Sequence, residues 1–259
     1  MEILTIILAS LIGIVSPVGV ILDRVFEGIL REHIYSAEKI DVRVDNTPSY
    51  AAVSGHLDHL MIAARGIEPI KDLRLHAFEI ETDPIDISLE KLKSENLKKS
   101  LLHPLQGGIR LEIKENDINK ALSSPTIKTT LQQFLNRATN SQTTRQFEIL
   151  NVSCQFIDSN TVAIATKLKQ GEDSKALELT LESKIKIVDA RSLQLIEPSG
   201  TLNGRKLSSR LLKGFADGLN EKLDLSLLAK NGFMVRILQL KIEQHTLHLA
   251  VFVRLEADK

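Results

Sequence analysis

The feature that most constrains this chain is a repeated alternation of apolar and polar residues over short segments that end in turn signals. Ile40, Val42 and Val44 alternate with charged residues, and the segment ends before Pro48, which has no backbone N–H for a strand ladder. Period-two alternation is typical of a strand with one apolar face. The pattern predicts strands over residues 40–45, 52–65, 73–80, 109–113, 147–156, 161–168, 176–188, 192–196, 234–242 and 246–255.

Apolar residues at helical spacing occupy fewer segments. One helix is predicted to begin at about Lys114 and a second at Pro125. Residues 88–102 are predicted to form either a surface helix or an ordered loop. A late helix is predicted over residues 206–222, with the stripe Leu207, Leu211, Leu212, Phe215, Leu219 and Leu223. Strands that follow one another without intervening helices favour antiparallel pairing, so the predicted fold class is α+β.

The N-terminus carries a different signal. From Ile3 to Leu22 there is no charged residue, and as a helix this stretch would span roughly 30 Å of hydrocarbon. Glu2 stands where a secretory signal needs basic residues, which favours an anchor or an uncleaved signal-like helix. We therefore predict two parts, a hydrophobic N-terminal segment at residues 1–22 and one domain at residues 23–259. Membrane association through that segment is expected, with the side of the membrane left open.

An amphipathic helix is predicted directly after the break at Pro17. Its apolar residues recur at helical spacing between Val18 and Ile34, and charged residues fill the other face. Such a stripe packs either on the sheet of its own domain or on a membrane surface. The two interpretations are compatible if the same sheet also binds lipid.

Composition excludes several classes of partner. The 33 basic and 33 acidic residues cancel, so no net positive field attracts nucleic acid. Cys154 is the single cysteine, which excludes an internal disulfide and a paired-cysteine metal site. Aromatic residues make up 4% of the chain and tryptophan is absent, so its apolar surface is aliphatic and suits flexible acyl chains better than stacked bases.

We find no sequence signature of catalysis. The pairs His56/His59 and His245/His248 have a spacing of three, which on a strand places the two rings on opposite faces. No serine-nucleophile elbow or glycine-rich phosphate loop is present. The prediction is a non-enzymatic protein without catalytic residues, metal or cofactor, and a hydrolase whose site is assembled only in space ranks last among the alternatives.

Five phrases in order resemble one family. They are VRVDNTPSY (42–50), SGHLDHLMIAARGI (54–67), FEIETDPIDI (78–87), LEIKENDINKALSSP (111–125) and LDLSLLAKNGFMVRILQLKIEQHTLHLAVFVRLE (223–256). Together they are similar to the LmeA-like phospholipid-binding proteins, especially the cyanobacterial branch. The resemblance implies an extended, curved antiparallel sheet packed on long amphipathic helices around an apolar cavity, similar to tubular lipid-binding (TULIP-like) folds. It also implies a lipid-binding domain and a place in the cell envelope.

The functional hypothesis is binding, and transfer as an extension of it, of phospholipid or another acyl lipid at a membrane. Nucleic acid is not an expected partner, and protein partners are left open. The alternative is a membrane-tethered scaffold for protein contacts without a lipid cavity. The predicted apolar wall comprises Phe26, Ile29, Leu30, Leu60, Ile62, Phe134, Leu211, Phe215 and Leu219. The predicted headgroup contacts are Arg205, Lys206 and Arg210, because backbone N–H groups at a helix start also favour phosphate.

Overall fold

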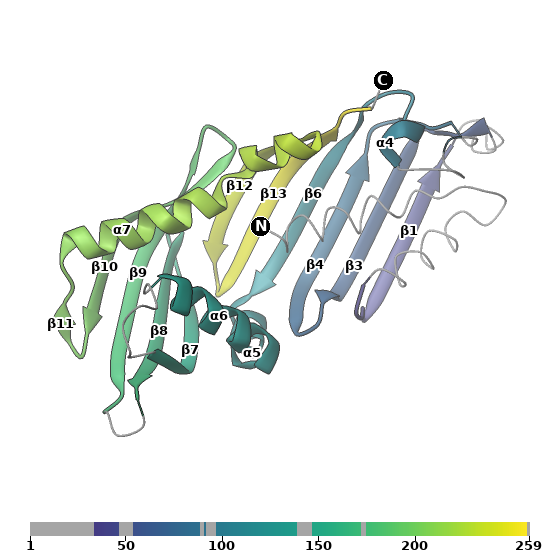
Figure 1. The fold of residues 1–259 in the computed structure, drawn as a ribbon. Helices are drawn as coiled ribbons and strands as arrows, with labels where there is room; N and C mark the ends of the chain where they lie inside the picture. Colours follow the sequence, from purple (N-terminus) through teal and green to yellow (C-terminus); the bar gives the residue numbers. More distant parts are fainter. Residues whose placement is uncertain are drawn as a thin grey trace.

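The computed structural model describes residues 34–46, 54–88, 91, 97–138, 147–171 and 175–257. Two large antiparallel sheets lie end to end and form an elongated molecule (Figure 1). One has six strands in the order β1-β3-β4-β6-β13-β12, and the other has five in the order β11-β10-β9-β8-β7. The α+β class and the antiparallel pairing predicted from the alternation are confirmed.

The six-stranded sheet has one apolar and one charged face. Its apolar face contains the cross-strand row Ile62, Ile80, Ile109, Val251 and Ile237. On the other face Arg65 and Arg110 pair with Glu79, and Arg110 also pairs with Glu112. Its strands are β1 (Lys39–Asp45), β3 (His59–Ile70), β4 (Leu73–Thr82), β6 (Leu105–Lys114), β12 (Phe233–Glu243) and β13 (Thr246–Leu255).

The five-stranded sheet carries most of the described helical structure. Its strands are β7 (Phe147–Ile157), β8 (Thr161–Gln170), β9 (Leu177–Val188), β10 (Ser192–Leu202) and β11 (Arg205–Lys206). Helices α5 (Glu115–Ser123) and α6 (Pro125–Ala138) pack at β7, and α7 (Ser209–Asn220) packs on β10. Shorter elements are β2 (His56–Leu57), β5 (Ile85–Asp86), α4 (Leu97–Ser100) and the 3₁₀ helices η2 (Glu221–Leu223) and η3 (Leu225–Asn231).

The two sheets meet where turns of the five-stranded sheet reach the edge strand β12. The backbone N–H of Ile237 donates to the carbonyl oxygen of Ala190 at 2.6 Å. The side-chain amide of Asn160 accepts from Ile242 N–H at 2.8 Å and donates to the Leu240 carbonyl at 3.3 Å. These bonds occupy backbone groups that an edge strand would otherwise expose.

The apolar faces of the two sheets lie on the same side of this junction. Cys154 and Phe156 of β7 form a buried cluster with Ile242 of β12, and Val162 and Ile185 pack against it. Ile187 and Leu193 of the five-stranded sheet in turn pack against the core of the six-stranded sheet. One apolar surface therefore continues from one sheet to the other.

The predicted long helices are wrong for the part of the chain that the structure describes. The longest described helix, α6, has 14 residues, and the helix predicted over residues 206–222 is α7, which ends at Asn220 and is followed by the 3₁₀ helix η2. The curled, tubular sheet is also wrong, because the strands divide into separate sheets. A stripe of apolar residues defines a helical face but not where the backbone ends the helix.

Two strand boundaries differ from the prediction for local reasons. Strand β10 continues past Pro198 to Leu202, because a bulge between Ile196 and Ser199 accommodates the proline. Strand β6 begins at Leu105, before the predicted start at Ile109, and includes Gly107. A Cβ at Gly107 would lie 2.5 Å from the Glu81 carbonyl oxygen, so the glycine permits close pairing with β4.

Candidate functional site: an open apolar groove

The floor of the site is the apolar face of the five-stranded sheet. Leu181 of β9 pairs with Ile164 of β8 and with Gly200 of β10, so these positions share one face. Unlike the buried core of the six-stranded sheet, this face is only partly covered. Its half-exposed residues include Ile164, Leu179, Leu181, Ile185, Leu195 and Leu202.

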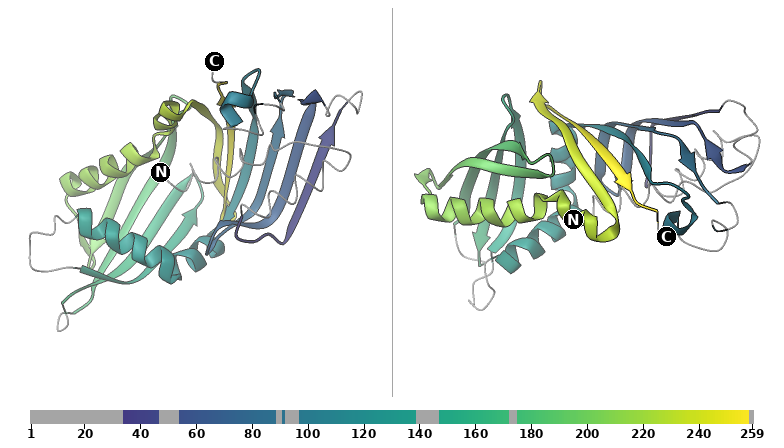
Figure 2. Two further views of the ribbon diagram at one scale, coloured as in Figure 1. Left: turned by 45° about the vertical axis from the view of Figure 1, so that its right-hand side comes forward. Right: turned by 90° about the horizontal axis from the view of Figure 1, so that it is seen from above.

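Two helical walls flank this floor. Helix α7 lies on β10 and buries Leu212 and Ala216, and Leu207 just before it reaches the groove side of Gly200. Opposite it, α5 packs Ile118 and Leu122 on the apolar cluster at β7, and α6 continues along the same edge. The view from above in Figure 2 shows both walls on one side of the sheet.

Helix α7 carries apolar side chains that are not buried against the sheet. Leu211 is 60% exposed and Phe215 is 43% exposed, although both neighbour the buried Leu212 and Ala216. In Figure 1, α7 lies in front of the sheet and runs from β11 at the left towards β12. In a right-handed helix with this orientation, the residue before each sheet-facing residue points down, towards α6. Leu211 and Phe215 therefore face the groove, and the half-buried Leu219 continues their row.

The α6 wall is positioned by polar contacts with the edge of β7. Gln132 Nε2 donates to the Phe147 carbonyl at 2.5 Å, and its Oε1 accepts from Ile149 N–H at 2.9 Å. Lys128 Nζ donates to the Leu150 carbonyl at 2.9 Å. Because these residues face β7 and α6 runs opposite to α7, the preceding positions point towards α7. Those positions are Ile127, Leu131 and Leu135, all half-buried.

Similar amide contacts hold the other two helices. Asn119 of α5 bonds both the N–H and the carbonyl of Cys154 at 2.8 Å. Asn220 of α7 accepts from Leu195 N–H at 2.7 Å and donates to its carbonyl at 3.4 Å. An Asn or Gln side chain presents the same donor and acceptor as a neighbouring strand, so each helix is bonded to strand backbone. These contacts set the width of the groove.

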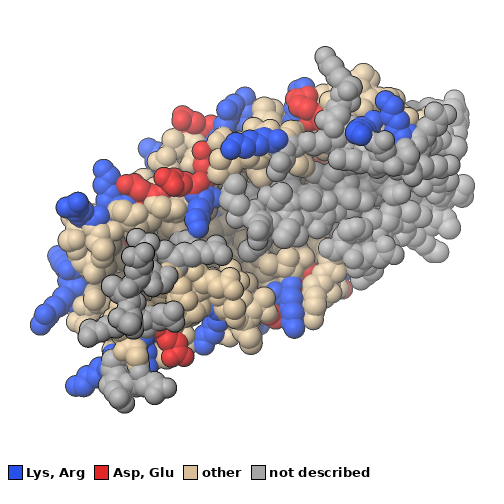
Figure 3. Space-filling view, viewed as in Figure 1, with Lys and Arg blue, Asp and Glu red and all other residues tan. Residues whose placement is uncertain are grey.

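The groove surface is uncharged between charged rims. In the space-filling view, Lys, Arg, Asp and Glu gather along α7 (Figure 3), whereas the floor positions Ile164, Leu179 and Leu181 are uncharged. At the junction end, burial raises the pKa of the Cys154 thiol to about 11, and Glu115 adds to the increase. Cys154 is therefore a neutral apolar residue at physiological pH and not an activated nucleophile.

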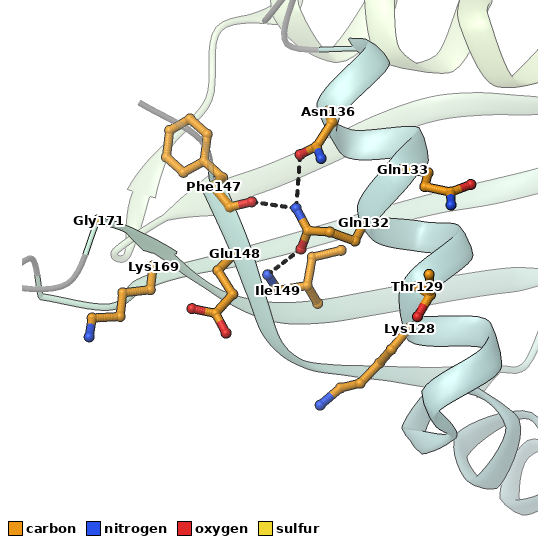
Figure 4. Close-up of a pocket in the computed structure, with 10 residues that line it drawn as sticks. All are labelled: Lys128, Thr129, Gln132, Gln133, Asn136, Phe147, Glu148, Ile149, Lys169 and Gly171. Carbon is orange, nitrogen blue, oxygen red and sulfur yellow. Dashed lines mark hydrogen bonds between the residues drawn. The ribbon is translucent and has the colours of Figure 1, made fainter. Parts of the chain in front are cut away.

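A separate pocket of about 630 Å³ lies on the outer side of α6 (Figure 4). Its lining is mostly polar, with Lys128, Thr129, Gln132, Gln133, Asn136, Glu148 and Lys169 beside Phe147, Ile149 and Gly171. Lys169 and Glu148 are register partners, so a positive and a negative side chain lie side by side on the two strands.

The paired histidines bond different carboxylates. His56 contacts Asp86 and Asp58, and His59 contacts Glu81. His245 and His248 contact Glu115 and Glu112. Within the described residues, no group of three or more His, Cys, Asp or Glu side chains is arranged to hold a metal ion.

The structure distributes the predicted wall residues over several places. Leu60 and Ile62 are each 3% exposed and belong to the core of the six-stranded sheet, away from the groove. Leu211, Phe215 and Leu219 line the groove. Phe134 lies on α6, but its side chain is outside the described part, as are all of Phe26, Ile29 and Leu30.

The predicted headgroup residues lie at the free end of the groove, away from the junction, and all three are exposed. Arg205 pairs with Leu202 and so shares the groove face, whereas Lys206 pairs with Thr201 on the opposite face. Arg210 is two positions before the sheet-facing Leu212, which places it on the outer side of α7.

Sequence reasoning missed the floor and the α6 residues. The alternation in residues 161–168 and 176–188 identifies their apolar face, and the spacing of Ile127, Leu131 and Leu135 identifies a stripe. Neither pattern shows which of these faces stays partly uncovered. That property depends on the distance between α6 and α7.

The fold and the groove define an α+β protein with an open, aliphatic binding surface. A family model described as LmeA-like phospholipid-binding matches residues 17–252, so the chain belongs to this family. The family description names binding and no reaction. Neither curated proteins nor solved structures yielded a match. Among the described residues, no helix combines the length and apolar character needed to cross a bilayer, and residues 1–22 lie outside that part.

Proposed function

We propose that this protein binds phospholipid without chemical conversion, with the acyl chains in the groove between α6 and α7. The observation that carries the proposal is the row of exposed or partly exposed apolar side chains that face each other over a partly covered apolar sheet. Leu211 and Phe215 lie on one wall, Leu131 on the other and Leu181 on the floor. A soluble domain rarely leaves such a continuous apolar surface without a ligand or a partner.

The energetics favour an aliphatic occupant. Each methylene removed from water contributes about 0.8 kcal/mol, so even half of one acyl chain supplies several kcal/mol. The described groove residues are mainly Leu and Ile, which pack on flexible chains without requiring a fixed geometry. At the junction the groove ends on apolar side chains, because Cys154, Phe156 and Ile242 form a buried cluster there.

Charge at the free end supports one orientation for the lipid. Arg205 is on the groove face beside Leu202, so we propose that it contacts the phosphate of a lipid whose acyl chains point towards the junction. Lipid transfer, membrane association through residues 1–22, a cell-envelope location and membership of the cyanobacterial branch remain predictions that extend this proposal.

The test is mass spectrometry of lipids that co-purify with the full chain. We expect stoichiometric phospholipid on the unchanged protein and its loss from Phe215→Asp, because a carboxylate in the groove is poorly solvated beside acyl chains. Leu238→Asp is the matched control, since Leu238 is 63% exposed on β12, outside the groove. Circular dichroism checks that both variants are folded.

Lipid on Phe215→Asp at the level of the control would show that the acyl chains lie elsewhere. No phospholipid on the unchanged full chain, even after incubation with phospholipid micelles, would reject the proposal. In that case the groove is better explained as a surface for a protein partner of a membrane-tethered scaffold.

A further inference from the structure

A stretch of unbalanced positive charge lies at the free end of the groove. Residues 203–216, which contain β11 and the first half of α7, include four basic residues and no acidic one. Lys206, Arg210 and Lys213, here called the basic rim, are all exposed. On the same sheet Lys167 and Lys184 pair with Glu178 and Glu197, but no described carboxylate lies within ion-pair distance of the rim.

Several basic residues of the six-stranded sheet are paired with carboxylates. Arg65 pairs with Glu79, Arg74 with Asp117 and Arg254 with Glu256. Since the chain as a whole has no net charge, the basic rim is a local excess at one end of an elongated molecule. An end with uncompensated positive charge is attracted to an anionic surface, and most strongly at low salt.

The basic rim also adjoins exposed apolar surface. Leu211 lies between Arg210 and Lys213 in sequence and is 60% exposed. Arg210 is on the outer side of α7, and Lys206 is on the side of β11 opposite to the groove. Basic residues beside an exposed leucine on a short amphipathic helix are typical of segments that lie on membrane surfaces.

We propose that the basic rim docks the free end of the groove on an anionic bilayer. This inference rests on the proposed lipid binding, and it adds the membrane surface from which lipid enters. Lys206, Arg210 and Lys213 contact headgroup phosphates of the bilayer, while Arg205 stays available to the bound lipid. Docking at this end places the groove mouth at the bilayer, so an acyl chain moves into the groove with little exposure to water.

The test measures binding of the full chain to vesicles of phosphatidylcholine, with and without one third phosphatidylglycerol, at low and high salt. Binding to phosphatidylcholine alone measures any contribution of the N-terminal segment. The variant is Lys206→Gln/Arg210→Gln/Lys213→Gln, and the control is Lys71→Gln/Lys230→Gln/Arg236→Gln, which removes three exposed basic residues elsewhere.

We expect phosphatidylglycerol to strengthen binding of the unchanged chain and of the control, with the gain lost at high salt. Each basic residue close to the bilayer strengthens vesicle binding about fivefold. At low salt the rim variant should therefore bind the vesicles with phosphatidylglycerol ~100-fold more weakly than the control does. Equal gains for the rim variant and the control would overturn the docking proposal, and so would a gain that salt does not reduce.

Lipid occupancy separates this proposal from the one on which it rests. Offered phospholipid in detergent micelles, the rim variant should still acquire lipid, because burial of acyl chains supplies the binding free energy. A rim variant that acquires lipid from micelles but does not bind the anionic vesicles supports both proposals. If no form of the protein acquires lipid from micelles, the groove proposal fails, and vesicle binding then reports only on docking.

Discussion

The two sheets are built from the same alternating pattern but differ in how their apolar faces are covered. Phe78, Leu60 and Ile62 in the six-stranded sheet are 1 to 3% exposed. The apolar face of the five-stranded sheet has fewer buried residues, and Leu179 and Leu181 at its centre are only partly buried, as Ile80 and Ile109 are in the six-stranded sheet. The difference arises from packing, because α6 and α7 lie along the two sides of the five-stranded sheet and leave its centre open.

In the proposed function, the six-stranded sheet mainly supplies stability and the five-stranded sheet supplies the binding surface. A closed apolar face contributes to folding, whereas an open one reserves its apolar area for a ligand. The amide contacts of Asn119, Gln132 and Asn220 position the helices through strand backbone, so the walls do not need to close over the floor to stay in place. Stability and lipid binding should therefore respond to different substitutions.

The largest expected effect comes from a comparison of two phenylalanines, Phe78 in the core of the six-stranded sheet and Phe215 on helix α7. Phe78→Ala should lower the free energy of unfolding by about 3–5 kcal/mol, because it leaves a cavity in a closed core. Phe215→Ala should cost less than about 1 kcal/mol, because its ring is already 43% exposed. Urea denaturation monitored by circular dichroism measures both. Equal losses would mean that the groove is as closed as the core.

A smaller effect is expected at the ion pair that ties α5 to the six-stranded sheet. Arg74 Nη1 lies 2.7 Å from Asp117 Oδ2, and the Asp117 side chain is 6% exposed. Arg74→Met leaves that carboxylate buried without a partner and should cost about 2–3 kcal/mol. Arg254→Met, which removes a more exposed pair with Glu256, is the control and should cost less than about 1 kcal/mol.

Hydrogen exchange extends that test across the junction. If α5 couples the sheets, Arg74→Met should also accelerate exchange of the Cys154 amide, which is bonded to Asn119 on the same helix. Unchanged exchange at Cys154 would show that the two halves respond independently.

The α6 wall offers a test with two adjacent glutamines. Gln132→Leu removes the partners of Ile149 N–H and of the Phe147 carbonyl and should cost about 1 kcal/mol. Gln133→Leu alters the exposed neighbour and should be close to neutral. Amide exchange of Ile149 should become faster in the first variant only. Similar Ile149 exchange rates in the two variants would show that Gln132 does not position the α6 wall.

The smallest effect concerns two histidines near the six-stranded sheet. Hydrogen bonds to Asp86 and Asp58 raise the pKa of His56 above 6.5, whereas burial lowers the pKa of His76 on β4, helped by Lys114 and Arg74. The stabilisation from His56 is complete below pH 6.5 and is lost as the pH rises through its raised pKa. His76 has the opposite sign, because the folded state resists its protonation as the pH falls below 6.5.

Nuclear magnetic resonance titration of the two rings checks these directions. We expect midpoints on opposite sides of pH 6.5, with His56 the higher. His56→Gln should remove the higher midpoint and leave the other unchanged. A His76 midpoint above 6.5 would mean that the surroundings of β4 admit water, which would weaken the contrast between a closed and an open sheet.

Local patterns predicted much of the fold and only part of the site. The alternation located most of the strands and their apolar faces, and the stripe in residues 206–222 identified Leu211, Phe215 and Leu219. Leu60 and Ile62 carry the same pattern but lie in the core of the six-stranded sheet. Individually, a core leucine and a groove leucine have the same sequence signature, so periodicity does not separate them.

The amino-acid sequence was enough to predict the antiparallel α+β class, the aliphatic character of the buried surfaces and of the groove, and the family. Contacts between distant segments place the strands in two large sheets, set α6 and α7 on either side of one of them, and bring to its free end basic residues that have no ion-pair partner among the described carboxylates. The physical reason is that periodicity specifies which side chains share a face. What packs against that face depends on contacts between residues far apart in the chain, such as Gln132 with Ile149 and Asn220 with Leu195.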